Sequence, residues 1–130
     1  MQRKEESDFS KVVKEIEVYD EDRFLKNKSD EIIELYEIYR DAILNLSSDI
    51  EIQPLKWVIM FKAKRKFAYI EIQKKCLKLW INLKTGQLED SRKIARDVST
   101  KGHGGNGDYE ITINDTENLE YIMSLIKQSL

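Results

Sequence analysis

The stretch EIQPLKWVIMFKAKRKFAYIEIQKKCLKLWINLK, residues 51–84, decides the fold of this chain. It is rich in the β-branched and aromatic residues that strands favour, and it holds the chain's single proline near its start. Three strands are predicted in it, over about residues 55–62, 67–73 and 77–83. Consecutive strands with short connections pair antiparallel, so a sheet of this kind is expected.

The apolar residues of the second and third predicted strands fix how these strands pair. They alternate with polar residues and lie on one face: Ala68, Ile70 and Ile72 in one strand, and Leu77, Leu79, Ile81 and Leu83 in the other. A loop of two or four residues sets Ile72 opposite Leu77, whereas a slip of one residue would set these side chains opposite lysines. The even loop is therefore expected. On the opposite face it pairs Tyr69 with Trp80, flanked by Phe67, Glu71, Lys78, Asn82 and Lys84.

Helices are predicted on both sides of these strands. One begins near Asn27 or Ser29, either of which could cap it, and runs to about Leu46 with an apolar stripe at helical spacing. A short helix is expected within residues 87–101, then a strand over DYEITI (108–113), then a closing helix with the capping-box pair Asn114 and Glu117. The order α-β-β-β-α-β-α predicts an α+β fold with a mainly antiparallel four-stranded sheet packed against helices. We expect residues 1–26 to be an N-terminal extension, whose order the sequence leaves open, and residues 27–130 to be a single domain.

Composition excludes several classes of protein. The chain is 41% hydrophobic and 35% charged, which is typical of a globular domain with a heavily solvated surface. No apolar run approaches the roughly 18 residues of a membrane span, and a signal peptide is not indicated, so a cytoplasmic location without membrane association is expected. The net charge of −2 conceals an uneven distribution: residues 1–55 carry 8 basic and 15 acidic side chains, residues 56–101 carry 13 and 4, and residues 102–130 carry 1 and 5. The basic middle third indicates either an anion-binding surface or a sheet that packs against acidic helices.

The loop GHGGNGD (102–108) holds four of the five glycines and the single histidine of the chain. It does not fit a dinucleotide fingerprint, because a helix is predicted before it and a strand after it, nor a Walker loop, because Asp108 stands where lysine is needed. A protein-kinase glycine loop is excluded by the length of the chain. His103 has no second histidine or nearby cysteine, so no metal, no cofactor and no catalytic residue is expected. We interpret the loop as a tight turn that needs positive φ, or as a nest of backbone N–H groups that binds an anion beside Arg96 and Lys101. Its residues are Gly102, His103, Gly104, Gly105, Asn106, Gly107 and Asp108.

Two functional hypotheses follow from these features. The first is a non-catalytic module that binds nucleic acid or phosphate, with bases stacked on the aromatic pair and basic residues on the phosphates. Its candidate residues are Lys64, Arg65, Lys66, Tyr69, Lys78, Trp80, Arg92, Lys93, Arg96 and Lys101. The second is a protein-interaction or dimerisation domain, for example a homodimer, in which the aromatic face is an interface. The aromatic pair could instead lie half-buried beneath a helix, with its polar tips exposed.

Three stretches also carry a resemblance to a known family: FAYIEIQKKCLKLWINL, IARDVSTKGHGGNGDYEITI and NLEYIMSLIKQSL. Over about residues 27–130 the chain resembles an uncharacterised bacterial and archaeal domain family often labelled "predicted transport protein". Members of that family occur alone or at the C-terminus of longer chains, some joined to nuclease-like domains of restriction systems. The resemblance implies an accessory binding role in a restriction or defence system, and it carries no catalytic residue over. This chain has Gly104 where the family tends to have a bulky residue.

Overall fold

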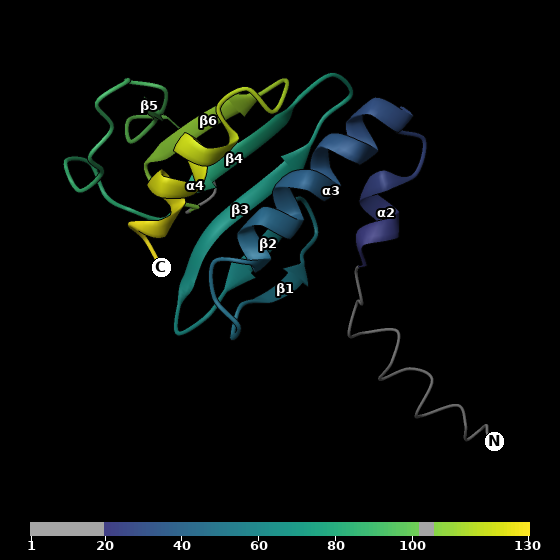
Figure 1. Ribbon diagram of the computed structural model, residues 1–130, viewed down its shortest axis with the longest axis horizontal. Coiled ribbons are helices and arrows are strands. Elements are labelled where there is room, and N and C mark those ends of the chain that lie inside the picture. Colours follow the sequence, from purple (N-terminus) through teal and green to yellow (C-terminus); the bar gives the residue numbers. More distant parts are fainter. Residues whose placement is uncertain (1–19, 102–105) are drawn as a thin grey trace.

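The centre of the fold is the antiparallel hairpin of β3 (Lys66–Ile72) and β4 (Leu77–Ile81) (Figure 1). Its register sets Ile72 opposite Leu77 and Tyr69 opposite Trp80, which confirms the predicted pairing. The register follows from burial, because the apolar set of each strand lies on the face that the helices cover.

The computed structural model describes residues 20–101 and 106–130, and within them the sheet has six strands in the order β1-β2-β3-β4-β6-β5. The other strands are β1 (Glu51–Pro54), β2 (Ile59–Lys62), β5 (Arg96–Asp97) and β6 (Tyr109–Ile113). All pairings are antiparallel. The predicted α+β class is therefore confirmed, but the prediction of four strands is wrong.

The extra strand β1 lies before the predicted strand over residues 55–62, and the first half of that predicted strand is a turn. The Leu55 N–H donates to the Val58 carbonyl oxygen at 2.8 Å, and this bond closes a tight connection between β1 and β2. The turn contains Lys56 and Trp57 and no glycine or asparagine, so its residues have the composition of a strand. Pro54 ends β1 at the edge of the sheet, where its missing N–H removes no ladder bond.

The second extra strand, β5, lies where a short helix was predicted, and that prediction is wrong. Lys93 has a positive φ of 56°, which ends any helical turn there. Asp90 organises the segment instead, since its carboxylate accepts hydrogen bonds from the Ala95 N–H at 2.7 Å and the Tyr121 hydroxyl at 2.5 Å. Burial alone would raise the pKa of Asp90, but these hydrogen bonds outweigh burial and hold the pKa below its ordinary value.

Two longer helices, α3 (Asp30–Leu44) and α4 (Leu119–Lys127), lie side by side on one face of the sheet (Figure 1). Ser29 caps α3, as one of the two predicted caps, and its Oγ accepts a hydrogen bond from the Ile32 N–H at 3.2 Å. The predicted stripe on α3 is buried at Ile32, Tyr36, Tyr39 and Ile43. These side chains join the apolar residues of β2, β3, β4 and β6 in one core.

The predicted capping box of the last helix is wrong, because α4 begins one turn later. Its N-cap is Asn118, which makes no side-chain capping bond, and the Glu117 N–H donates instead to the Asp115 carboxylate at 3.0 Å. The C-terminus is fixed by Ser129, which is buried and whose hydroxyl donates to the Phe67 carbonyl oxygen at 3.0 Å.

A short helix, α2 (Glu21–Leu25), precedes α3 within the segment predicted as an extension. The Asp20 carboxylate caps it through the Arg23 N–H at 3.1 Å, and Glu21 accepts a hydrogen bond from the hydroxyl of Tyr36 on α3. These contacts attach residues 20–25 to the domain. The predicted division of the chain at residue 26 stays a prediction.

A β-bulge moves Phe67 away from the face on which it was predicted. Phe61 pairs with Ala68 and Lys62 pairs with Lys66, so Phe67 is the extra residue of β3. A bulge re-aims the side chains of its strand, and Phe67 is fully buried in the core beneath the helices rather than beside Tyr69.

Candidate nucleic-acid interface

The two aromatic residues proposed as a stacking platform are paired but buried. Tyr69 and Trp80 are 6% and 8% exposed, and they form a second, smaller cluster with Val58, Met60 and Val98 on the face away from the helices. Burial raises the pKa of Tyr69, an effect that the nearby guanidinium of Arg65 partly opposes. A base could therefore stack on either ring only after the residues around them moved.

The indole N–H of Trp80 is buried and has no hydrogen-bond partner in the described part of the chain. Leaving such a donor unpaired costs about 1–3 kcal/mol. The residue directly opposite Trp80 on β6 is Glu110, whose carboxylate forms an ion pair with Arg96.

Two of the predicted phosphate-binding residues are engaged by that carboxylate. Arg96 lies 2.8 Å and Lys78 lies 3.6 Å from the same Glu110 oxygen, and the Lys78 ammonium also donates to the Thr112 hydroxyl at 2.8 Å. The Glu110 side chain is only 12% exposed, so it needs cations to compensate its burial. Lys78 and Arg96 are therefore ion-pair partners of Glu110 in this structure.

Another predicted residue, Arg92, lies beside α4. The Arg92 guanidinium lies 4.5 Å from the centroid of the Tyr121 ring and donates to the Asn118 side chain at 3.1 Å. Its neighbour Lys93 is exposed in the left-handed turn described above. Arg92 is thus engaged by residues at the start of α4.

The remaining candidates gather where the β2–β3 turn meets the end of β4. The Ala63 N–H donates to the Arg65 carbonyl oxygen at 3.0 Å and closes the turn. The Arg65 guanidinium donates to the Asn82 carbonyl oxygen at 2.5 Å, and the Asn82 amide donates to the Lys66 carbonyl oxygen at 2.7 Å. We call this region the basic end of the sheet; its cationic residues are Lys62, Lys64, Arg65, Lys66 and Lys84.

The charges of the basic end are poorly neutralised. The ammonium groups of Lys64, Lys66 and Lys84 form neither a hydrogen bond nor an ion pair within residues 20–101 and 106–130. Lys62 and Lys66 face each other directly across β2 and β3, and like charges in that position are destabilising. Acidic residues near the cations include Glu51, opposite Lys62, and Asp49, whose pKa is lowered first by the Ser47 hydroxyl and least by Lys64. The Asp108 carboxylate lies at Thr85, the residue after Lys84.

The glycine loop is described only at its C-terminal side. Gly102, His103, Gly104 and Gly105 lie outside the described residues, so the predicted anion nest stays a prediction. Gly107 has a φ of +115°, as the proposed tight turn requires, and it packs against the backbone of Ile81 and Asn82. The Asp108 N–H donates to the Leu83 carbonyl oxygen at 3.0 Å, and its carboxylate accepts from the Thr85 N–H at 2.9 Å. The loop therefore ends beside the basic end of the sheet, and Lys101 is exposed at its start.

Three features that the structure brings forward were not predicted as parts of a site. Lys62 and Lys84 belong to the basic end but were not among the predicted phosphate-binding residues, and their signal in the sequence was the density of lysine around the predicted turn. Trp57 is 72% exposed on the β1–β2 turn, with the Lys56 ammonium 5.2 Å from its ring centroid.

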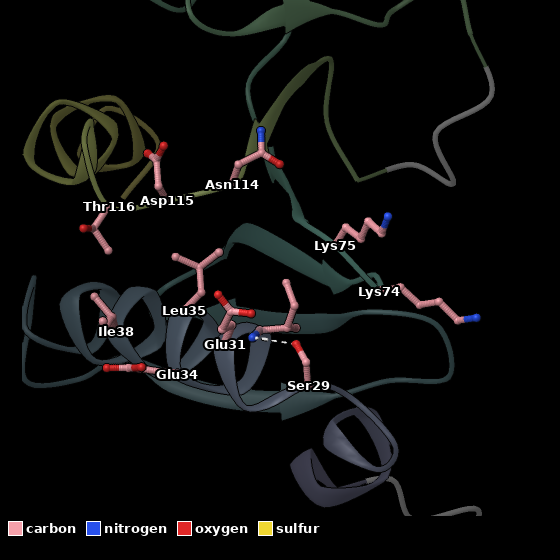
Figure 2. A pocket seen from close by; sticks show the side chains of 11 residues that line it. Ser29, Glu31, Glu34, Leu35, Ile38, Lys74, Lys75, Asn114, Asp115 and Thr116 are labelled. Carbon is pink, nitrogen blue, oxygen red and sulfur yellow. Dashed lines mark hydrogen bonds between the residues drawn. The ribbon is translucent and has the colours of Figure 1, made fainter.

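The third feature is a groove of about 690 Å³ between α3, the β3–β4 turn and the β6–α4 connection (Figure 2). Its lining residues come from three separate parts of the chain, so no local pattern could indicate it.

No group of three or more His, Cys, Asp or Glu side chains able to hold a metal occurs among the residues for which the structure gives positions. Within the same residues, no helix has the length and apolar character needed to cross a bilayer.

Comparisons with known proteins agree with the fold-bearing region of the chain. A relative from Haemophilus influenzae, described as an uncharacterized protein, is 56% identical over 119 residues. The match covers 92% of this chain and 39% of the relative, so the chain spans about two fifths of that protein's length. No solved structure matches the chain. The model of the family described as "Domain of unknown function (DUF5655)" matches residues 21–129, which include every strand, α3 and α4, and the chain therefore belongs to that family.

Proposed function

We propose that this domain is a non-catalytic module that binds the phosphates of nucleic acid through the basic end of its sheet. The observation that carries the proposal is the facing pair Lys62 and Lys66 on β2 and β3, with Lys64 and Arg65 in the turn between them. An anion between these side chains would relieve their mutual repulsion, and exposed lysines and arginines are the usual partners of phosphate oxygens.

The aromatic pair has a different role in this proposal from the one expected from the sequence. Because Tyr69 and Trp80 are buried, binding is expected to depend on phosphates and not on stacked bases. Affinity should then be similar for different sequences and should fall steeply with salt. In longer relatives such a module would hold the rest of the chain close to nucleic acid, as an accessory to a restriction or defence protein.

The experiment is fluorescence anisotropy with labelled single-stranded and duplex oligonucleotides over a salt series. The variant Lys64→Gln/Lys66→Gln removes two cations from the basic end, and Lys26→Gln/Lys28→Gln removes two from the connection before α3 as a matched control. If both lysines contact phosphates, the first variant should reduce the log–log salt slope by about 1.8 on duplex and about 1.4 on single strands. The control should keep the wild-type slope.

Two results would count against the proposal. Equal losses in the two variants would show that only net charge matters. No binding of either oligonucleotide at low salt, with the protein shown to be folded by circular dichroism, would end the nucleic-acid interpretation.

A further inference from the structure

The groove beside α3 lies on the helical face of the molecule and is separate from the basic end. One wall is α3 with Glu31, Leu35 and Ile38, and the other is the β6–α4 connection with Asn114 and Asp115 (Figure 2). Leu35 and Glu31 point from the helix into the space between the walls, and lysines of the β3–β4 turn stand at one end. Its volume of about 690 Å³ is in the range of pockets that bind ligands or peptide side chains.

The two walls are held together, so the groove exists before anything binds. The Tyr39 hydroxyl on α3 donates to the Asp115 carbonyl oxygen at 3.0 Å, and burial raises the pKa of Tyr39 to about 12, so the hydroxyl remains a donor over the ordinary pH range. The Asp115 carboxylate is fixed in turn by the Glu117 N–H at 3.0 Å. Little ordering of the protein is therefore needed on binding.

The charges around the apolar floor define the kind of occupant. Ile32, Leu35 and Ile38 form the floor, and the carboxylates of Glu31, Glu34 and Asp115 stand on both sides of it. Within the described parts of the chain none of these carboxylates forms an ion pair. An apolar floor between unpaired carboxylates is complementary to a chain segment that carries apolar residues next to lysine or arginine.

We propose that the groove between α3 and the β6–α4 connection is a docking site for a basic amphipathic segment of a partner protein. Apolar side chains of the segment contact Leu35 and Ile38, and its lysines or arginines pair with Glu31, Glu34 and Asp115. The inference does not depend on nucleic-acid binding, because it uses a different surface, on which carboxylates stand on both walls and Lys74 and Lys75 stand at one end.

The test uses a fluorescein-labelled 14-residue helical peptide with leucines on one stripe and lysines elsewhere. A second peptide of the same pattern carries glutamate in place of lysine. We expect saturable binding of the lysine peptide to the full chain, no binding of the glutamate peptide, and NMR methyl shifts at Leu35 and Ile38. The variant Glu31→Lys/Glu34→Lys should weaken binding about tenfold or more, since it replaces attraction by repulsion.

The matched control is Glu37→Lys/Glu120→Lys, which changes the net charge equally at two positions that do not line the groove. It should change the dissociation constant less than twofold. Equal weakening by the two variants, shifts confined to other surfaces, or equal binding of both peptides would overturn the proposal. A dimer seen by sedimentation velocity that is lost only in Glu31→Lys/Glu34→Lys would assign the groove to a second copy and would also overturn it.

Discussion

Replacing Gly107 by alanine tests the packing of the glycine loop against the sheet. Gly107 has a φ of +115°, and a Cβ added there would lie 2.3 Å from the Ile81 carbonyl oxygen and 2.6 Å from the Asn82 Cα. Both neighbours are backbone atoms of β4 or of the residue after it, so neither can rotate away. The backbone must shift, or the loop must leave the sheet.

Gly86 is the matched control for this substitution. It has a φ of +88°, but a Cβ there would meet nothing within 4 Å. A non-glycine residue in such a conformation costs about 1–3 kcal/mol, and this cost applies at both positions. The close approach to β4 applies only at Gly107, where overpacking adds about 1–3 kcal/mol. We therefore expect Gly86→Ala to lower the free energy of unfolding by about 1–3 kcal/mol and Gly107→Ala by about 2–6 kcal/mol.

Urea unfolding followed by circular dichroism at 25 °C measures both differences, provided that the slope with denaturant stays constant. A loss near 4 kcal/mol is a large part of the roughly 5–15 kcal/mol that keeps a domain folded, so Gly107→Ala could also be partly unfolded without denaturant. Equal losses at the two positions would refute the contribution of the backbone contact. A loss below about 1 kcal/mol at Gly107 would refute the described packing altogether.

Two further predictions concern the small aromatic cluster and the Asp90 segment. Trp80→Phe leaves the exposed Trp57 as the sole tryptophan, and iodide should quench its fluorescence strongly. Trp57→Phe leaves the buried Trp80, whose fluorescence iodide should quench weakly. Stronger quenching of Trp80 than of Trp57 would contradict the burial described. Tyr121→Phe removes the donor to Asp90 and should lower the free energy of unfolding by about 1 kcal/mol at pH 7. Because the folded pKa of Asp90 lies below the ordinary 3.8, this contribution is complete above about pH 4 and is lost as the pH falls through the folded pKa. Urea titrations at pH 7 and pH 3 should therefore show a smaller difference in stability between wild type and Tyr121→Phe at pH 3. A difference that grows at low pH would contradict this account.

The alternating apolar residues of β3 and β4 predicted the register correctly because one face of these strands is buried under helices. Where a strand or turn has no alternating apolar residues, the sequence carried no such signal. β5 is two charged residues, Arg96 and Asp97, which pair with β6 through their main chain. The turn at Leu55–Val58 is closed by backbone bonding around residues that otherwise favour strands.

The sequence indicated only part of what determines the charge of the basic end. The cluster of lysine and arginine at residues 62–66 is local in the sequence, so it could be seen without a structure. Whether Lys78 and Arg96 are available depends on Glu110, which is distant in the chain and reaches them only through the pairing of β6 with β4 and β5. The burial of Trp80 likewise depends on Val98, a residue that the sequence placed in a helix.

The proline at the end of β1 affects whether another chain can add a strand at this edge of the sheet. Since Leu55 bonds to Val58, alternation along the strand turns the N–H groups of Glu51 and Gln53 towards β2, and position 54 faces solvent. Within β1, Ile52 is then left with the one outward amide hydrogen, because Pro54 has none. A strand from another molecule would find a single donor where a ladder needs several, so this border is a poor template for sheet extension. Extended segments of other chains are therefore not expected to add a strand to the sheet beside β1.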